Sequence, residues 1–550
     1  MKVAGTYILF GIVYLSMIVL IYKKTGIKDE NLNYKLALFS IYFIAVLLRV
    51  YKFNTLPGLD SDEAMGAINS WSLGKWGVDY FNLASHPIYL YAWGSGMNIL
   101  YPTIAIPFIK VLGLNIVAYR SPLIILNIIA IGTVIFALIK SEWTKRNILL
   151  FTIIVFLTPV TIVNCRWAVE SNLFPTIFYL VFALFLLYQS TNGITRNVYW
   201  VILNLLIAIS AYAYSNNWMF LGIFVILLLV WQIFNQFISI KTACLTLIGY
   251  LVIEFPLILF LYVNYISKKS ISLFGLTIPK LAATRSAFVH LDINSICSNL
   301  ESVISILWSG CDNRPKMGLS GLGAFLPFMI SFAFAGIIIL SCKGKMRSNV
   351  DNFILIMLIS VIPNIIFVEA SWLHLNALLL PLLYCEVMGV GYTFSSKRTL
   401  GTFYTLFVLL LALYCKNYVK DNVETFNNYF NTTSVELGNM ISNANSSDNI
   451  YIYADNNKNY TNVGSMYVLP IFYNKLDPWT YKKEAKIIKN GEWRSAFDYG
   501  KWHIRFSPDF NKVKRRNDNV TYIIQNGTVP SSKLKHYKKI TEGDYYTVYR

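Results

Sequence analysis

Charged residues are scarce in this chain. Asp, Glu, Lys and Arg make up 14% of its 550 residues, whereas hydrophobic residues make up 56%. Soluble domains carry about 25% charged residues, and the mean hydropathy here is +0.51, so the shortage of charge excludes an ordinary soluble protein. Apolar stretches of about 17–25 residues, long enough to cross a bilayer, recur along the first three quarters of the chain. The sequence therefore predicts a polytopic α-helical membrane protein.

Cysteine is also sparse. The seven cysteines lie at scattered positions and none falls in residues 417–550, so no disulfide framework is predicted. A recognisable signal peptide is missing as well, because only Lys2 precedes the first apolar run and no clear small-residue cleavage site follows it. That first run is expected to remain as a helix.

About twelve apolar stretches are predicted to be membrane helices. They cover residues 5–22, 36–53, 121–140, 148–164, 173–189, 198–214, 218–235, 243–263, 319–341, 352–368, 377–395 and 400–416. Basic residues occupy alternate short connections, for example at Lys145, Lys241 and Lys343, and such residues mark cytoplasmic loops. The outer side then holds the segment 54–120, the turn 165–172, the long loop 264–318, the turn 369–376 and the tail. The net charge of +19 fits these loops and fits contact with anionic lipid or substrate equally well.

The chain divides by composition into a membrane module, residues 1–416, and a separate small α/β domain outside the membrane, residues 417–550. In the first outer loop, 54–120, aromatic-rich helices are expected at the membrane interface, although a further crossing at 99–116 stays an alternative. In the tail, short alternating runs such as "NIYIYAD" predict strands, and "PWTYKKEAKIIKNG" predicts a short helix ending at Gly491. The lysine-rich tail is either a solvated surface near anionic lipid or a polyanion-binding groove.

Three acids stand together in "GLDSDEAMG", just outside a predicted membrane helix. The spacing of Asp60 and Glu63 predicts a capping box at the start of a helix. Asp62 is left without a structural explanation. Carboxylates at a membrane interface serve enzymes as general bases or as metal ligands, so Asp62 is a candidate catalytic residue.

Further acids and cations are predicted to face the same side of the membrane from other segments. "NCRWAVESN" places Arg166 and Glu170 at the outer junction of two helices, and "EASWLHLNALLLP" places His374 where the chain re-enters the membrane. His86 lies in the first outer loop and Arg285 in the long outer loop. Each is explained separately as a helix-end or structural residue, but together they suit a reaction on a charged lipid headgroup.

The first outer loop carries a family resemblance. "LPGLDSDEAMGAINSWSLGKWGVDYF", "HPIYLYAWGSGMNILY" and "PFIKVLGLNIVAYRSPLIILN" resemble the corresponding loop of the GT-C membrane glycosyltransferases, in the branch of the aminoarabinose lipid A transferases and protein O-mannosyltransferases. The family order is an Asp-Glu pair, a His-Pro or Lys-Pro-Pro step and an Arg opening the next helix. Asp62-Glu63, His86-Pro87 and Arg120 follow that order. The similarity covers about residues 36–400 and is strongest over 56–130.

The resemblance implies a GT-C fold and an inverting glycosyltransferase of the outer face that uses a polyprenyl-phosphate sugar as donor. The acceptor would be a cell-surface glycan, a lipid or a protein, and no nucleic acid is implied. Asp62 would act as the base, with Glu63 and Glu170 as the other catalytic acids. The donor's phosphate or sugar would be bound by basic residues at His86, Arg120, Arg166, Arg285 and His374. No metal is assigned, although binding of a divalent metal at the acid cluster is left as an alternative.

The chain departs from the family in three places. The helix predicted over 5–22 precedes the family's usual first helix. His86-Pro87 stands where the aminoarabinose branch has Lys-Pro-Pro, which argues against the lipid A reaction itself, and Glu170 stands where Asp is frequent. Two other functions stay open: a transporter or flippase for lipid-linked saccharides, and a multi-span polymerase. Glu254 and Glu386, within predicted helices, motivate the transporter because charge inside a membrane is costly and often functional. The small number of such charges and the lack of an inverted repeat count against it.

Overall fold

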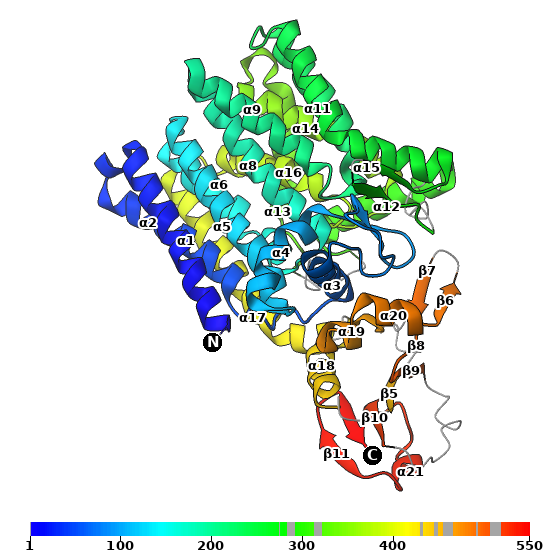
Figure 1. The fold of residues 1–550 in the computed structure, drawn as a ribbon. Helices are drawn as coiled ribbons and strands as arrows, with labels where there is room; N and C mark the ends of the chain where they lie inside the picture. Colours follow the sequence, from blue (N-terminus) through cyan, green and yellow to red (C-terminus); the bar gives the residue numbers. More distant parts are fainter. Residues whose placement is uncertain are drawn as a thin grey trace. The chain divides into compact units, whose positions relative to one another are not determined.

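The computed structural model describes residues 2–273, 275–282, 292–312, 322–429, 433–444, 449–454, 466–490, 493–506 and 519–550. The chain forms two compact units (Figure 1). We call residues 1–51, 123–258 and 286–418 the helical unit, and residues 52–122, 259–285 and 419–550 the mixed unit. The mixed unit therefore combines the predicted first outer loop with the tail.

The helical unit is built from long apolar helices. Its helices are α1 (Lys2–Lys24), α2 (Leu32–Val50), most of α5 (Ile116–Lys140), α6 (Lys145–Leu157), α7 (Pro159–Arg166), α8 (Glu170–Ser190), α9 (Gly193–Ser210), α10 (Trp218–Phe234), most of α11 (Ile240–Leu261), α12 (Ile293–Ser309), α13 (Met329–Cys342), α14 (Asn349–Ser360), α15 (Ile362–Phe367), α16 (Leu379–Thr393) and most of α17 (Lys397–Tyr429). Among the described residues, nine helices are long and apolar enough to cross a membrane, or ten if one bent pair counts as a span. The protein is thus multi-pass, and the number twelve stays a prediction.

The bent pair is α6 and α7, which the sequence predicts as one helix over 148–164. The two helices meet at 52° because Pro159, the first residue of α7, cannot donate a backbone hydrogen bond to the preceding turn. Arg49, which is fully buried at the end of α2, donates to the carbonyls of Phe156 at 2.9 Å and Thr161 at 3.3 Å. The guanidinium of Arg49, from α2, therefore supplies hydrogen bonds to carbonyls on both sides of the bend. After the bend, α7 continues to Arg166, its last residue.

Two glycines allow α13 and α16 to pack closely. A Cβ at Gly336 would collide with the carbonyl oxygen of Cys385, and one at Gly389 would collide with that of Phe332. Small residues at such crossings are typical of membrane helices, where packing rather than hydrophobic burial drives association. Glu386, predicted to lie at mid-span, is fully buried in α16.

The mixed unit has three segments that are distant in sequence. The first contains α3 (Ser61–Trp76), the short strands β1 (Tyr89–Leu90) and β2 (Met97–Asn98), and α4 (Leu100–Leu112). At 13 residues α4 is too short to cross a bilayer and is classed with the shorter apolar helices among the described residues. The small hairpin of β3 (Ile271–Leu273) and β4 (Leu276–Ile278) belongs to the same unit.

The tail folds around a six-stranded mixed sheet in the order β11-β12-β10-β5-β9-β8. β5 (Asn449–Ala454) lies between β9 (Trp502–Phe506) and β10 (Val520–Gln525) and is parallel to both. The remaining elements are β8 (Asp498–Tyr499), β11 (Lys539–Glu542), β12 (Tyr546–Tyr549), α18 (Thr433–Asn443), α19 (Val468–Asn474), α20 (Pro478–Glu484), α21 (Ser531–Leu534) and the hairpin of β6 (Ile487–Asn490) with β7 (Trp493–Ala496). These strands agree with the alternating runs of the sequence.

One tail prediction is wrong. The helix expected over "PWTYKKEAKIIKNG" ends at Glu484 as α20, and the following "IIKN" forms β6. Pairing of β6 with β7 outweighs the local helical pattern. The predicted domain boundary between residues 416 and 417 falls inside α17, Lys397–Tyr429, and the division into domains 1–416 and 417–550 stays a prediction.

Candidate active site

The acid cluster forms the first turn of α3. Asp60 is the N-cap residue and its Oδ1 accepts the amide hydrogen of Asp62 at 2.8 Å. Glu63 returns the contact by accepting the amide hydrogen of Asp60 at 3.1 Å. The predicted capping box is therefore confirmed, and it satisfies backbone groups that a helix start leaves without partners.

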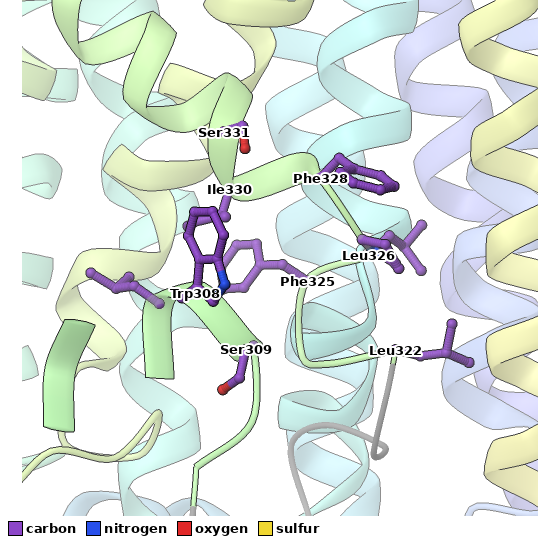
Figure 2. Close-up of a pocket in the computed structure, with 11 residues that line it drawn as sticks. Trp308, Ser309, Leu322, Phe325, Leu326, Phe328, Ile330 and Ser331 are labelled. Atoms are coloured by element: carbon purple, nitrogen blue, oxygen red, sulfur yellow. The ribbon is translucent and has the colours of Figure 1, made fainter. Parts of the chain in front are cut away.

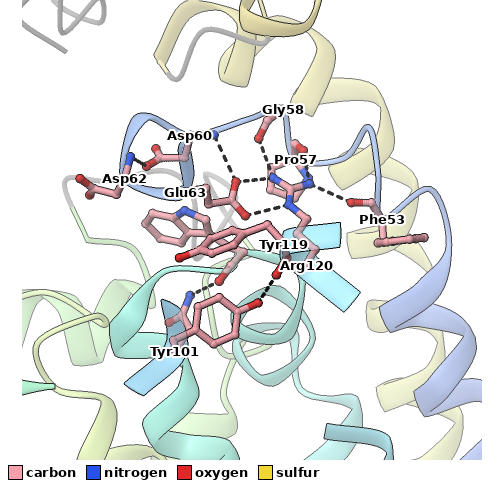
Figure 3. Close-up of polar contacts among 11 residues, drawn as sticks. Phe53, Pro57, Gly58, Asp60, Asp62, Glu63, Tyr101, Tyr119 and Arg120 are labelled. Atoms are coloured by element: carbon pink, nitrogen blue, oxygen red, sulfur yellow. Dashed lines mark hydrogen bonds and ion pairs between the residues drawn. The ribbon is translucent and has the colours of Figure 1, made fainter. Parts of the chain in front are cut away.

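Glu63 also forms a buried ion pair with Arg120 (Figure 3). Both side chains are fully buried, with Arg120 Nε 2.7 Å from Glu63 Oε1 and Nη2 2.5 Å from Oε2. Arg120 donates its other hydrogens to the carbonyls of Phe53, Pro57 and Gly58 at 2.7–2.8 Å. All five N–H groups of this guanidinium are therefore used within the loop that leads into α3.

This arrangement gives Glu63 and Arg120 a positioning role in the structure. A proton acceptor or a phosphate ligand needs an accessible atom, and neither side chain has measurable exposure. The sequence predicts that Arg120 contacts the donor phosphate and that Glu63 is catalytic. Either role requires the ion pair between Glu63 and Arg120 to open. Burying both charges together avoids the large cost of an isolated buried ion.

Asp62 lies in the same turn but points into a different environment. It is partly exposed, and its Oδ1 accepts a hydrogen bond from the indole Nε1 of Trp93 at 2.7 Å. The capping box and the Glu63–Arg120 pair hold the backbone on which Asp62 sits. Asp62 is consequently the acid of the cluster that combines a fixed position with access to solvent.

Trp93 was not identified from the sequence. It has a left-handed backbone conformation, φ +56°, and is followed by Gly94 at φ +98°. A bulky residue with positive φ is uncommon and such strain concentrates at functional sites. The only sequence signal is the placement of a tryptophan beside glycines in "YAWGSG", which is weak because the interaction partner lies 31 residues away.

Asp79 is a second residue that sequence analysis missed. Its side chain is buried, and it accepts hydrogen bonds from the amides of Phe81 at 3.0 Å, Asn82 at 2.6 Å and Tyr91 at 2.6 Å. Burial raises the pKa of this carboxyl to about 6, against the opposing effect of the three amides and of Lys482. Asp79 therefore shapes the chain between α3 and β1.

His86 lies in that segment but does not join the acids. Its ring is exposed and contacts the Ser85 hydroxyl through Nδ1 at 3.0 Å. The backbone φ is +42°, and the amide of His86 donates to the Gly77 carbonyl at 2.8 Å. An exposed imidazole on a tight turn is accessible to a ligand, and a role in donor binding stays a prediction.

Arg166, Glu170 and His374 belong to the helical unit. Arg166 ends α7 and Glu170 begins α8, so the predicted helix junction is confirmed and the two residues do not share a helix. Arg166 is 3% exposed and donates to the carbonyls of Leu48 and Tyr51, both at 2.6 Å. A cation at a helix C-terminus and an acid at a helix N-terminus both complement the helix dipole.

The turn that carries His374 contacts the start of α8. Asn376 Nδ2 donates to the carbonyl of Ser171, next to Glu170, at 2.8 Å. His374 Nδ1 lies 2.8 Å from the Glu369 carbonyl, and its ring stacks on Tyr214 with centroids 6.4 Å apart. The structure thus joins the segments of Glu170 and His374, which are about two hundred residues apart in sequence.

An apolar pocket of about 230 Å³ lies where α12 ends and α13 begins (Figure 2). Trp308 and Phe328 line it and are 79% and 77% exposed. Phe325, also in the lining, packs on Trp372 with ring centroids 4.9 Å apart. The carbonyl of the preceding Ala324 accepts a hydrogen bond from Val160 of α7. This apolar pocket therefore adjoins α7, the helix of Arg166, and the turn of His374.

Arg285 lies outside the described residues. Within the described ranges, no group of three or more His, Cys, Asp and Glu side chains is arranged to hold a metal ion. Of the three acids near α3, Asp60 and Glu63 are engaged in the capping box. The structure offers no argument for adding a metal to the acid cluster.

No family model matches the sequence, and no curated protein does. Solved structures do match. One is ArnT from Cupriavidus metallidurans in the apo state, with a TM-score of 0.51 and 12% identity over 94% of this chain and 96% of that chain. Another is the same protein bound to undecaprenyl phosphate, with a TM-score of 0.50 and 12% identity over 94% and 97%.

This likeness confirms the resemblance in the sequence at the level of the fold. It extends over nearly the whole of both chains, and the long apolar helices and the small sheet agree with the predicted architecture. The chain is therefore a multi-pass membrane protein with a fold like that of ArnT.

Proposed function

We propose that this protein is an inverting glycosyltransferase that moves a sugar from a polyprenyl-phosphate donor to an acceptor on the outer face of the membrane. The observation that carries the proposal is Asp62, a partly exposed carboxylate held at the start of α3 by the capping box and bonded to Trp93. The fold shared with ArnT supports the reaction class, and its complex with undecaprenyl phosphate supports a polyprenyl-phosphate donor.

Asp62 is the base in this mechanism. The acceptor hydroxyl loses its proton to the Asp62 carboxylate as its oxygen attacks the anomeric carbon. The bond between that carbon and the phosphate oxygen breaks on the opposite side, so the configuration inverts and the lipid phosphate leaves as an anion. A phosphate needs no added proton to leave, and therefore one base is sufficient.

Glu63 and Arg120 support Asp62 without touching substrate. Their ion pair and the bonds from Arg120 to three carbonyls fix the loop whose helix carries Asp62. The indole of Trp93 donates to one carboxylate oxygen and so fixes the orientation of the carboxylate that accepts the proton. A carboxylate that is already held in position needs little reorganisation during the reaction, which lowers the barrier.

The donor phosphate would be bound by cations of the helical unit. Arg166 is the first candidate because a guanidinium matches phosphate with two parallel hydrogen bonds. Binding in this way requires Arg166 to exchange its bonds to the carbonyls of Leu48 and Tyr51 for bonds to the phosphate. Glu170 is close to Arg166 in sequence, and the turn of His374 contacts the start of α8 through Asn376. The apolar pocket at Trp308 and Phe328 adjoins α7 and suits the first isoprene units of the lipid. Arg285 and His86 remain candidates for the same anion.

The donor site is tested by replacing Arg166. Arg166→Ala is expected to weaken binding of undecaprenyl phosphate to the purified protein at least tenfold, and Arg166→Lys is expected to weaken it less, because Lys keeps the charge but not the forked geometry. Arg398→Ala, at an exposed position of α17, is the control and should bind normally. Equal binding by all three folded variants would remove Arg166 from the donor site.

Orientation gives a separate prediction. In a cysteine-free version of the chain, a cysteine placed at position 62 or 500 should react with an impermeant thiol reagent in intact cells, and one placed at 345 should not. The reason is the Lys/Arg bias of the loops, which assigns position 345 to the cytoplasm. Labelling at 345 without labelling at 62 would reverse the orientation and would rule out chemistry on the outer face.

The reaction itself is tested with purified protein in vesicles that contain a polyprenyl-phosphate sugar, with a saccharide acceptor on the same side of the membrane. Formation of a glycosylated product with release of polyprenyl phosphate supports the transferase. Movement of the donor across the bilayer without product would instead support the flippase. Growth of a polymer from repeated additions would support the polymerase.

A further inference from the structure

The mixed unit contains a cavity that the proposed mechanism does not use. It has a volume of about 520 Å³ and is enclosed by the segment after α3, by residues 280–282 and by the region from α19 to β7. This volume falls within the range of about 300–1,000 Å³ for small-molecule sites. All of its lining residues belong to the mixed unit.

The lining of this cavity is strongly basic. Lys280, Lys482 and Arg494 are cationic, and none of the described residues that line the cavity is acidic. In the part of the chain that the structure describes, the ammonium groups of Lys280 and Lys482 form no ion pair. Three cationic residues line one concave surface, with the carboxyl of Asp79 near Lys482 as the acid that partly offsets them. A surplus of cations favours an anionic ligand.

Aromatic rings form the rest of the wall. Tyr467 and Tyr481 are buried, and Phe81 packs edge to face on both, with centroid distances of 6.3 Å to Tyr467 and 5.6 Å to Tyr481. Tyr91 is partly exposed at the same surface. Rigid aromatic faces pack against the C–H surfaces of a sugar ring and lose little conformational entropy in doing so. The combination of such faces with cations fits a saccharide that carries an acidic group.

The cavity is connected to Asp62 through a single residue. The amide of Arg494 donates to the carbonyl of Trp93 at 2.8 Å, and Tyr467 packs edge to face on the Trp93 ring with centroids 5.6 Å apart. The indole of Trp93 in turn donates to Asp62. The strained backbone of Trp93 is therefore held between the cavity wall on one side and the proposed base on the other.

We propose that this cavity binds the acceptor by an acidic sugar, one that bears a carboxylate or a phosphate, and so presents the acceptor's hydroxyl to Asp62. Lys280, Lys482 and Arg494 bind the anion, and the partly exposed Tyr91 contacts the sugar ring. Identifying the bound saccharide as the acceptor rests on the proposed function. The binding of an acidic saccharide is argued from the cavity alone.

Binding to the purified full-length protein in nanodiscs tests this site. Trigalacturonic acid and glucose 6-phosphate serve as the carboxylate and phosphate probes, with trigalactose and glucose as their neutral counterparts. We expect at least one acidic probe to bind at least tenfold more tightly than its neutral counterpart, because charge-assisted hydrogen bonds are about twice as strong as neutral ones. The probe that binds identifies the acidic group. Equal affinity for acidic and neutral saccharides would overturn the proposal.

Variants separate the cavity from general surface charge. Lys280→Gln combined with Lys482→Gln should weaken binding of the acidic probe about tenfold, and Lys535→Gln, at an exposed position of the same unit, should leave it unchanged. Equal weakening by both would show that the attraction is not local. Competition by phosphatidylglycerol in the nanodisc that removes all saccharide binding would instead assign the cavity to lipid and overturn the proposal.

Asp62→Asn distinguishes the two proposals. This variant should still bind the acidic probe, because the carboxylate is outside the cavity lining. If the wild-type protein binds the probe but glycosylates no acceptor in the vesicle assay, the proposed transferase function is wrong and the saccharide site is supported. If transfer occurs and the double lysine variant has an unchanged KM for an acidic acceptor, the site fails and the transferase stands.

Discussion

Replacing Asp62 by Asn is expected to lower the rate of sugar transfer by a factor of about 10²–10⁴, the usual loss when a general base is removed. Asn keeps the size of the side chain and can still accept the hydrogen bond from Trp93. It cannot accept a proton from the acceptor hydroxyl. The folded protein and its affinity for undecaprenyl phosphate should persist, so the loss should appear in kcat, measured with purified protein and saturating donor.

Asp60→Asn is the matched control for this change. Asp60 lies two residues away and carries the same functional group, but its carboxylate accepts the amide of Asp62 as the N-cap of α3. Asn is about as good an N-cap as Asp, so activity and stability should change little. Equal and mild effects of the two substitutions would mean that the acid cluster only starts a helix.

Breaking the Glu63–Arg120 pair should have the largest effect on stability. In Glu63→Gln the guanidinium stays buried with its charge uncompensated, and loss of one partner of a buried pair costs about 3–5 kcal/mol. Arg120→Met should be at least as damaging, because the carbonyls of Phe53, Pro57 and Gly58 lose their donors as well. The measurement is thermal unfolding of the detergent-purified protein together with the yield of folded material.

The matched control is Glu542→Gln. Glu542 pairs with Lys539 at 2.7 Å in the same unit, but both side chains are about half exposed, at 63% and 48%. Water screens such a pair and its removal changes stability little. If Glu63→Gln unfolds at the same temperature as Glu542→Gln, the buried pair does not hold the loop, and the positioning role of Glu63 and Arg120 is wrong.

Local features of the fold could be predicted from the sequence. The capping box depends only on an Asp and a Glu three residues apart at the start of a helix, and it forms as expected. The long apolar helices follow from run length alone. The strand after α20 could not be predicted, because "IIKN" pairs with β7 and that pairing is a tertiary contact.

The roles of the candidate site residues stay predictions. The sequence singles out the acids near α3 and the basic positions Arg120, Arg166 and His374, but it does not identify their partners. Arg120 meets Glu63 across 57 residues, and Asn376 meets Ser171 across 205. Trp93 has only a weak local signal, and neither the Asp79 contact to Tyr91 nor the basic cavity has one, because these features depend on contacts between segments that are separated in the chain.

The sequence by itself determined that this protein is a multi-pass membrane protein with acids at the end of an early apolar helix, since hydropathy and short-range spacing are properties of neighbouring residues. Only the tertiary structure decided how those acids differ. The guanidinium of Arg120 buries Glu63 as a positioning residue, whereas Asp62, one residue earlier, turns toward Trp93 and solvent. Successive side chains on a helix point about 100° apart, and what each one meets in that direction is set by chain segments that no local pattern identifies.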